Sequence, residues 1–194
     1  MEKRVGKAKL KSAVLYSAII LIWVYLLFAA DIWKGMRVFC IVLVIVVIGI
    51  VIPGISYCQL MWKVDQERLY YTYHRTFLDK VTAFYSFVFN RKHIYQIAIN
   101  LNQIDYIDVS YAKVPRMPFG GYGYDLLFIV HMYDGSIYQF DALITRNRQE
   151  FNEAVDFLQA QGVQIHDSLK ILDYLKTGSY LSYYLEKLEE QSHD

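Results

Sequence analysis

The chain has 194 residues, of which 55% are hydrophobic and 20% are charged, and its formal net charge is +1. This composition is apolar enough to suggest membrane segments but too charged for a protein made only of spans. The low net charge, with no recognition-helix motif or arginine-rich stripe in the sequence, argues against nucleic acid as a partner.

Two apolar segments near the N-terminus are long enough to cross a membrane. Residues 12–30 contain no charge, and residues 38–52 form a second apolar run that weakly polar neighbours extend. About 20 helical residues span a hydrocarbon core of about 30 Å. Only residues 31–37 separate the two runs, so the sequence predicts an antiparallel transmembrane hairpin over residues 12–56.

The basic residues beside these segments predict their orientation. Residues 1–11 contain five Lys or Arg and one Glu, whereas residues 31–37 contain two Lys or Arg. The positive-inside rule therefore makes residues 1–11 a basic cytoplasmic tail, and two crossings return the rest of the chain to the cytoplasm. The expected location is the cell membrane, as a multi-pass protein with both termini cytoplasmic.

The apolar segments also fit two alternatives to a transmembrane hairpin. One is a cleaved signal peptide followed by a single span. The second is a pair of buried helices in a soluble protein. In the transmembrane interpretation, Pro53 and Gly54 end or kink the second helix, and Tyr57 and Trp62 belong to the aromatic belt at the membrane interface.

From residue 57 onward the apolar pattern becomes strand-like. We expect a first hairpin of strands over Trp62–Val64 and Leu69–Arg75, then strands over Ile94–Asn100 and Ile104–Lys113. Two of the chain's three prolines and three of its ten glycines lie in Val114–Gly123, which predicts a loop.

The C-terminal part begins with a second hairpin and continues as helices. The strands Tyr124–Tyr133 and Ser136–Ile144 flank Asp134-Gly135, which predicts a type I′ turn. Asn147 and Gly162 are the expected caps of the helix that follows. Between Asp167 and Glu190 we expect two short helices, broken at Thr177-Gly178, that pack against the sheet.

This order of elements resembles the bacterial pleckstrin-homology-like membrane proteins, the group that includes YcxB-like and other small bacterial PH domains. The similarity covers roughly residues 57–163, and it is carried by the segments KVDQERLYY, QIAINLNQIDYIDVSY, LLFIVHMYDGSIYQF and NRQEFNEAVDFL. The resemblance implies an α+β fold, in which two transmembrane helices precede a PH-like antiparallel β-sheet or barrel closed by a C-terminal helix. It also implies a binding or scaffolding module rather than a catalyst, and it transfers no site residue.

The corresponding domain organisation has four parts. They are a basic tail over residues 1–11, a transmembrane hairpin over 12–56, a β-domain over 57–163 and a helical extension over 164–194.

No residue pattern is typical of a catalytic, metal or cofactor site. The five histidines lack the spacing of metal ligands. Gly120, Gly121 and Gly123 are not followed by the lysine or the helix that a phosphate-binding loop needs. Asp105 and Asp108 are expected on opposite faces of their strand, which does not suit joint acid-base catalysis. We therefore expect no enzymatic activity and no cofactor.

Two segments are candidate contact surfaces. Residues 77–93 interleave aromatic and basic side chains, which favours contact with the inner leaflet, unless this segment is a strand or helix that completes the core. The Pro/Gly-rich loop is a candidate surface for a protein partner, unless its apolar residues pack inward. The candidate contact residues are Phe77, Lys80, Phe84, Arg91, Lys92, Arg116 and Phe119.

These features predict a membrane-anchored, non-enzymatic adaptor or regulatory protein. Its cytoplasmic domain would bind a protein partner or the inner-leaflet surface. The alternative is an accessory subunit of a transporter or envelope-assembly complex that is engaged through the transmembrane hairpin. The expected partners are the lipid bilayer and an unidentified protein.

Overall fold

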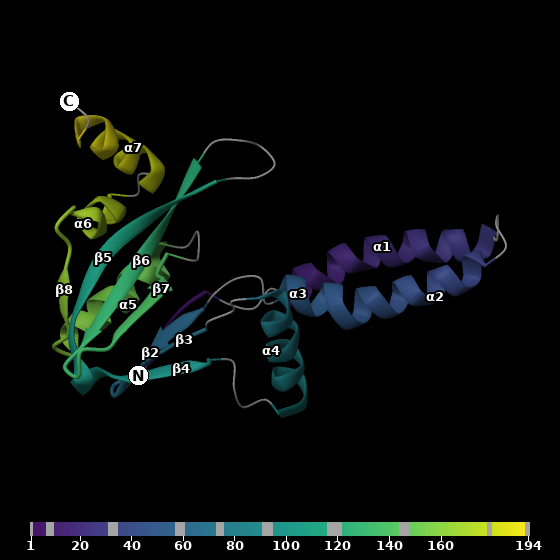
Figure 1. Cartoon of the computed structure of the whole chain (residues 1–194), viewed down its shortest axis with the longest axis horizontal. Coiled ribbons are helices and arrows are strands. Elements are labelled where there is room, and N and C mark those ends of the chain that lie inside the picture. The colour runs from purple at the N-terminus through teal and green to yellow at the C-terminus, as the bar shows by residue number, and fades with distance from the viewer. Residues whose placement is uncertain are drawn as a thin grey trace. The chain divides into compact units, whose positions relative to one another are not determined.

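In the computed structural model the chain forms two compact units. The structure describes residues 2–6, 10–30, 35–56, 61–72, 76–90, 95–115, 122–143, 148–177 and 180–192. The β unit comprises residues 1–6, 61–71 and 97–194, and the helical unit comprises residues 7–60 and 72–96. The chain therefore leaves the β unit twice to build the helical unit and returns each time (Figure 1).

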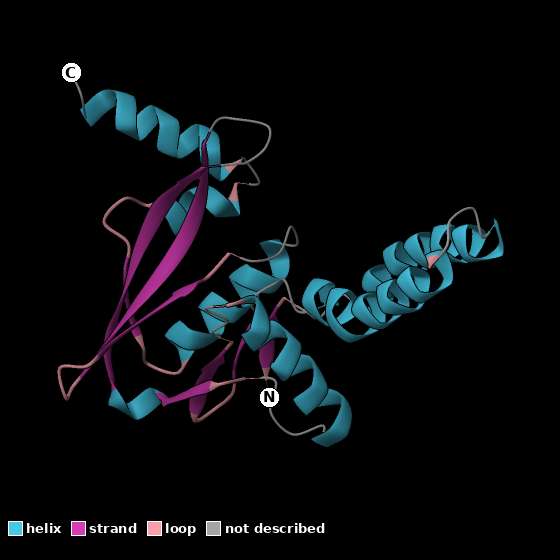
Figure 2. Ribbon diagram, turned by 45° about the vertical axis from the view of Figure 1, so that its right-hand side comes forward, coloured by secondary structure: helices cyan, strands magenta, loops and turns pink. Residues whose placement is uncertain are grey.

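The helical unit contains the two predicted apolar helices. The first is α1 (Leu10–Ala30), and the second runs through α2 (Met36–Val46), the π-helical turn η1 (Val47–Val51) and α3 (Ile52–Ser56). Both are 21 residues long and apolar enough to cross a membrane by length and composition. They lie side by side and pack along their length (Figure 2).

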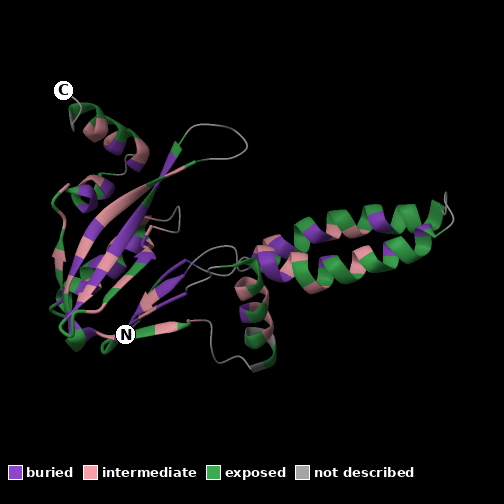
Figure 3. Cartoon of the chain, in the orientation of Figure 1, coloured by how far each residue is buried: buried purple, intermediate pink, exposed green. Residues whose placement is uncertain are grey.

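Most side chains of these two helices are exposed in the isolated chain (Figure 3). The buried ones on α1 are Ala13, Ser17 and Val24. The small residues Ala13 and Ser17 are one helical turn apart, so they lie on one face and allow a neighbouring helix to approach closely.

A third helix, α4 (Phe77–Asn90), completes the helical unit. Its first turn is a reciprocal capping box: the Thr76 backbone N–H donates to Asp79 Oδ2 at 2.7 Å, and the Asp79 N–H donates to Thr76 Oγ1 at 3.2 Å. The aromatic segment after residue 76 is thus helical, and it packs on α3 within the helical unit instead of completing the β core.

The β unit contains two four-stranded sheets. Sheet A is antiparallel in the order β1 (Lys3–Val5), β2 (Trp62–Val64), β3 (Arg68–Tyr71) and β4 (Ile97–Asn100). Its register places one residue of each strand in a single row across the sheet: Val5, Trp62, Tyr71 and Ile97. Each of the four lies at, or next to, the residue at which the chain leaves or re-enters the β unit.

Strand β1 was not predicted, because residues 1–11 were expected to be a basic tail. Three residues are too few to show a strand periodicity, and two of them are charged. The third, Val5, is fully buried in the core. Lys3 forms an ion pair with Glu153.

Sheet B has the order β7 (Ile137–Asp141), β6 (Tyr122–Met132), β5 (Ile104–Pro115) and β8 (Gln164–His166). β5, β6 and β7 are antiparallel, but β8 pairs with β5 in parallel, so this sheet is mixed. The expectation of a single antiparallel sheet or barrel is wrong: the strands form two open sheets. The 3₁₀ turn η2 (Leu101–Gln103) leads from β4 into β5.

Three helices bury their apolar stripes in the core of the β unit: α5 (Arg148–Ala160), α6 (Ile171–Lys176) and α7 (Leu181–Ser192). The predicted end of α5 is confirmed, since Gly162 has φ of +88° and the Val163 N–H donates to the Leu158 carbonyl. Its predicted N-cap, Asn147, lies outside the described residues. The break between α6 and α7 and their packing in the core are also confirmed.

The hairpin between β6 and β7 is confirmed, but its turn type is not. Gly135 has φ of +82°, whereas Asp134 has no positive φ, so the turn is not type I′. The Met132 N–H donates to the Ser136 carbonyl, which leaves a three-residue loop with glycine in the left-handed position. The Asp134 carboxylate fixes this loop by accepting from the Ser136 N–H and hydroxyl.

Trp62 joins the two sheets and α5. Its side chain is fully buried, and its Nε1–H donates to the Ala142 carbonyl at 2.8 Å. Its ring contacts Phe128 and Phe140 from sheet B and Phe151 from α5. The prediction that Trp62 belongs to the membrane aromatic belt is therefore wrong, because the side chain lies in the core of the β unit.

We expect Trp62→Phe to lower the free energy of unfolding of the β unit by about 1–3 kcal/mol, because it removes a buried hydrogen bond and part of the ring contact. Trp23→Phe is the matched control, since Trp23 is 65% exposed on α1. Urea unfolding of each variant in detergent micelles, followed by circular dichroism, measures the difference. Equal midpoints for the two variants would contradict the role assigned to Trp62.

Candidate functional site

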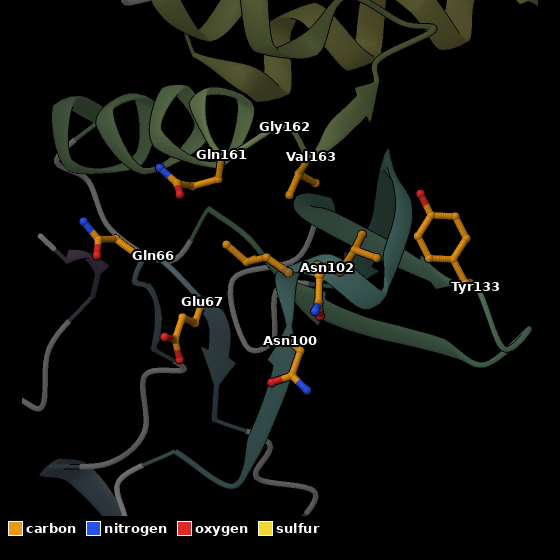
Figure 4. A pocket seen from close by; sticks show the side chains of 10 residues that line it. Gln66, Glu67, Asn100, Asn102, Tyr133, Gln161, Gly162 and Val163 are labelled. Carbon is orange, nitrogen blue, oxygen red and sulfur yellow. The ribbon is translucent and has the colours of Figure 1, made fainter.

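A hollow of about 660 Å³ opens in the surface of the β unit (Figure 4). Four separate segments line it: the turn between β2 and β3, the stretch from Asn100 to Ile104, the turn after β6 and the end of α5. The lining residues are Gln66, Glu67, Asn100, Leu101, Asn102, Ile104, Tyr133, Gln161, Gly162 and Val163.

The register of sheet A shows at which end of the sheet the hollow forms. The row from Val5 to Ile97 marks the end where the chain passes to and from the helical unit. The turn that carries Gln66 and Glu67 joins β2 to β3 at the opposite end, and Asn100 ends β4 there too. The hollow therefore forms at the end of sheet A that carries no connection to the helical unit.

The hollow has an apolar floor and a polar rim. Leu101, Ile104 and Val163 are each less than 10% exposed and belong to the hydrophobic core, so they form the floor. The polar lining groups are four side-chain amides, one carboxylate and one phenol, from Gln66, Asn100, Asn102, Gln161, Glu67 and Tyr133. Most of the exposed lining surface is polar, with a small apolar part at the base, and polar groups that converge in a concave surface are typical of binding sites.

The electrostatic character of the hollow is acidic. Glu67 is the charged residue among its lining residues, and no Lys or Arg is among them. Gln161 and Gly162 follow the carboxyl end of α5, where backbone carbonyls carry partial negative charge. Arg68 is the nearest basic residue along the chain, but it does not line the hollow.

Short hydrogen bonds hold the walls of the hollow together. The Leu101 N–H donates to the Glu67 carbonyl at 2.8 Å, and the Tyr133 N–H donates to the Gln103 carbonyl at 3.0 Å. Asp65 Oδ1 accepts from the N–H groups of Glu67 and Arg68 at 2.9 and 2.8 Å. Burial acts to raise the pKa of Asp65, but these two hydrogen bonds, a side-chain hydrogen bond with Tyr70 and the positive charge of Lys63 together leave the pKa below its ordinary value.

A second polar cluster lies on sheet B. Tyr106 stacks between the imidazoles of His131 and His166, with ring centroids 4.3 and 4.6 Å away. Asp108 approaches both histidines: Oδ2 lies 3.1 Å from His131 Nε2, and Oδ1 lies 3.5 Å from His166 Nδ1. One carboxylate thus links β5 to both neighbouring strands.

The sequence analysis missed this cluster, because the two histidines are brought together by strand pairing. Tyr106 pairs with His131 on β6, and Asp108 pairs with His166 on β8. The alternation of Tyr106 and Asp108 along β5 is visible in the sequence, but the parallel pairing of β8 is not. Among the described residues no group of His, Cys, Asp or Glu has the arrangement of a metal site. The four residues of the cluster do not line the hollow.

Three of the seven predicted contact residues lie on one described helix. Phe77, Lys80 and Phe84 lie on α4 in the helical unit. Phe77 contacts the second apolar helix, where a Cβ at Gly54 would overlap its ring. The other four candidates, Arg91, Lys92, Arg116 and Phe119, lie outside the described residues.

Tyr85 is one of the aromatic residues of the segment over residues 77–93, but the sequence analysis did not place it among the candidate contact residues. In the structure it joins α4 to the second apolar helix. Its hydroxyl donates to the Gly49 carbonyl at 3.0 Å. Gly49 lies in the π-helical turn, four residues before Pro53, which has no N–H to donate. The bond therefore satisfies a carbonyl whose α-helical partner is absent, in a segment apolar enough to be embedded in lipid.

Comparisons of the chain with protein-family models, with curated proteins and with solved structures found no match.

We expect Asp65→Ala to destabilise the turn that carries Gln66 and Glu67 by about 1 kcal/mol, because two backbone N–H groups lose their acceptor. Because the folded pKa of Asp65 is depressed, its contribution is complete above the unfolded value of about 3.9 and disappears as the pH falls through the lower folded value. Unfolding of wild type and variant, measured from neutral pH down to about pH 3, should show a stability difference that shrinks below about pH 4. A difference that grows on acidification would contradict this assignment.

We expect Tyr85→Phe to lower the stability of the helical unit by about 0.5–1.5 kcal/mol, because the Gly49 carbonyl loses its donor. Tyr25→Phe is the matched control, since Tyr25 is 68% exposed on α1. Hydrogen exchange of the α4 amides in lipid nanodiscs measures the effect. Faster exchange in the Tyr85 variant alone is expected; unchanged exchange would contradict the fastening role.

Proposed function

We propose that the chain is a membrane-anchored, non-enzymatic adaptor or regulatory protein whose β unit is a PH-like binding module at the cytoplasmic face of the membrane. One observation carries this proposal: β1 precedes the first span, and it pairs with β2, which follows the second. The anchor is therefore an insertion between two adjacent strands of the binding module. In this arrangement the hollow is the binding site.

The exposure of the two long helices supports their insertion in a bilayer. Large apolar side chains such as Leu15, Trp23 and Ile45 are at least 60% exposed. A continuous apolar surface of this size is unfavourable in water and favourable in lipid. It also argues against the alternative of two buried helices in a soluble protein, which would be mostly covered.

The pairing of β1 with β2 also bears on the signal-peptide alternative. Cleavage after α1 would separate Lys3–Val5 from the chain, and sheet A would lose its first strand together with the fully buried Val5. The same pairing favours an even number of crossings, because both ends of the hairpin must return to one side. With the basic residues before α1, the positive-inside rule then favours the cytoplasm.

The element order supports the PH-like assignment. Sheet A supplies four antiparallel strands, β5 to β7 supply three more in the second sheet, and α5 follows directly. Strand β8 and helices α6 and α7 are additions to that order. The insertions fall between β1 and β2 and between β3 and β4, which are loops at one end of sheet A.

Helix α4 is suited to the membrane interface. Leu78 and Phe89 are 70% and 77% exposed, while Asp79 and Lys80 are the charged residues of the helix. An amphipathic helix with exposed apolar side chains, held against a span, favours a position at the boundary of headgroups and acyl chains. In this position Phe77, Lys80 and Phe84 would contact the inner leaflet.

A hairpin exchange tests the proposal. Residues 10–46 are replaced by an unrelated transmembrane hairpin, while β1 and the segment that holds α4 are kept. We expect the set of proteins captured by in-cell crosslinking to stay the same, because the β unit does the binding. A matched variant that also lacks residues 2–6 should lose these partners, since sheet A then lacks its edge strand. Loss of the partners in the first variant would overturn the proposal.

The second candidate function, an accessory subunit engaged through the hairpin, is favoured by one observation. An apolar hollow of about 350 Å³ lies between α1 and α2, lined by residues that include Leu21, Phe28, Cys40 and Ile45. Such a surface suits a transmembrane helix of another protein. The hairpin exchange separates the two candidates, because it removes this hollow and leaves the β unit intact.

Accessibility labelling tests the orientation. In a variant without Cys40 and Cys58, single cysteines are placed at Glu2, at Asp31 between the spans and at Asp134 in the turn after β6. We expect a membrane-impermeant maleimide to label only position 31 in intact cells, and positions 2 and 134 only after permeabilisation. Labelling of positions 2 and 134 from opposite sides would contradict the hairpin.

A further inference from the structure

We propose that the hollow of the β unit binds an extended segment of a protein partner through an Arg or Lys side chain, rather than an anionic lipid headgroup. This inference rests on the proposed function, and it adds the chemical class of the ligand.

The charge of the lining residues favours a basic ligand. A phosphorylated headgroup requires cationic or N–H donor groups that converge on its oxygens. The lining residues of the hollow include no Lys or Arg, and its charged member is the carboxylate of Glu67. The carboxyl end of α5, at Gln161 and Gly162, adds partial negative charge. A phosphate would be repelled here, whereas a guanidinium or ammonium group would be attracted.

The shape of the hollow favours a long side chain with a charged head. Leu101, Ile104 and Val163 are nearly buried, and they add a small apolar surface at the base of its polar rim. Arg and Lys carry a long aliphatic stem below their charged head. Such a side chain can place its stem over the small apolar base and its head beside Glu67. An inorganic cation or a small ammonium ion can pair with Glu67 but leaves the apolar base uncovered.

The distribution of polar groups around the rim suits an extended peptide backbone. Gln66, Glu67 and Gln161 lie on one side of the hollow and Tyr133 on the other, with Asn100 and Asn102 between them (Figure 4). Amide side chains both donate and accept hydrogen bonds, so they match the alternating groups of an extended peptide backbone. Tyr133 is 71% exposed and offers a ring face to a second side chain of the segment.

Hydrogen bonds fix the backbone of the walls before a ligand binds. Glu67 is held through its own carbonyl by the Leu101 N–H and through its N–H by Asp65. Tyr133 is held by the Gln103 carbonyl. Because the backbone of these walls is already fixed, binding has to order only the side chains, which lowers its cost in conformational entropy.

The test uses the full chain in nanodiscs of zwitterionic lipid, which removes non-specific attraction to an anionic bilayer. The probe is a fluorescein-labelled pentapeptide, Ser-Gly-Arg-Gly-Ser, and its binding is measured by fluorescence anisotropy. The comparison peptide carries citrulline, which has the shape of arginine without its charge. We expect the arginine peptide to bind about tenfold more tightly, because a charge-assisted hydrogen bond to Glu67 is lost with citrulline.

Two variants localise the interaction. Glu67→Gln should abolish the difference between the two peptides. Glu186→Gln is the matched control, because it removes the same charge from an exposed position on α7 that does not line the hollow, and it should change binding less than about twofold.

Three results would overturn the inference: no binding of the arginine peptide, equal binding of the two peptides, or displacement of the arginine peptide by inositol hexakisphosphate. Each of these leaves the hairpin exchange untouched as a test of the adaptor function. Loss of cellular partners on hairpin exchange would instead overturn the adaptor function, even if the arginine peptide binds at Glu67.

Discussion

The pairing of β1 with β2 is the constraint on which the rest of the structure depends. These strands are separated by the whole apolar hairpin, yet Val5 lies opposite Trp62 in the sheet. The hairpin is therefore an insertion between two adjacent strands of one sheet. The second insertion, between β3 and β4, leaves the sheet from the same row.

The row of Val5, Trp62, Tyr71 and Ile97 also couples the anchor to the core. Trp62 is the first residue of the strand that follows the hairpin, and it is the residue that joins both sheets to α5. Tyr71, at the last position before the second insertion, stacks on Phe140 with centroids 4.6 Å apart. The residues that connect the units are thus among the best packed in the β unit.

Local patterns predicted most elements, and long-range pairing accounts for what was missed. Runs of apolar residues, the capping glycine at Gly162 and the Asp-Gly turn are properties of neighbouring residues, so the spans, α5 and the second hairpin were predictable. β1 is three residues long, and β8 pairs in parallel after a helix, so neither has a local signal. Trp62 was misassigned because tryptophan beside a span is equally typical of an interface and of a core. The hollow combines four segments that only the folded sheet brings together, and no motif in the sequence marks it.

The positions of the insertions leave one end of sheet A for ligand binding. The hairpin and α4 lie where loops would otherwise join β1 to β2 and β3 to β4. In the proposed arrangement, apolar helices would therefore contact the bilayer in place of basic loops. A module anchored in this way would not need basic side chains that bind lipid headgroups. The turns at the other end are then free to carry a different chemistry, and their amides, Tyr133 and Glu67 are suited to a peptide segment with a basic side chain. Because anionic leaflets concentrate basic segments near the membrane surface, an acidic hollow on an anchored module would meet such partners at a raised local concentration.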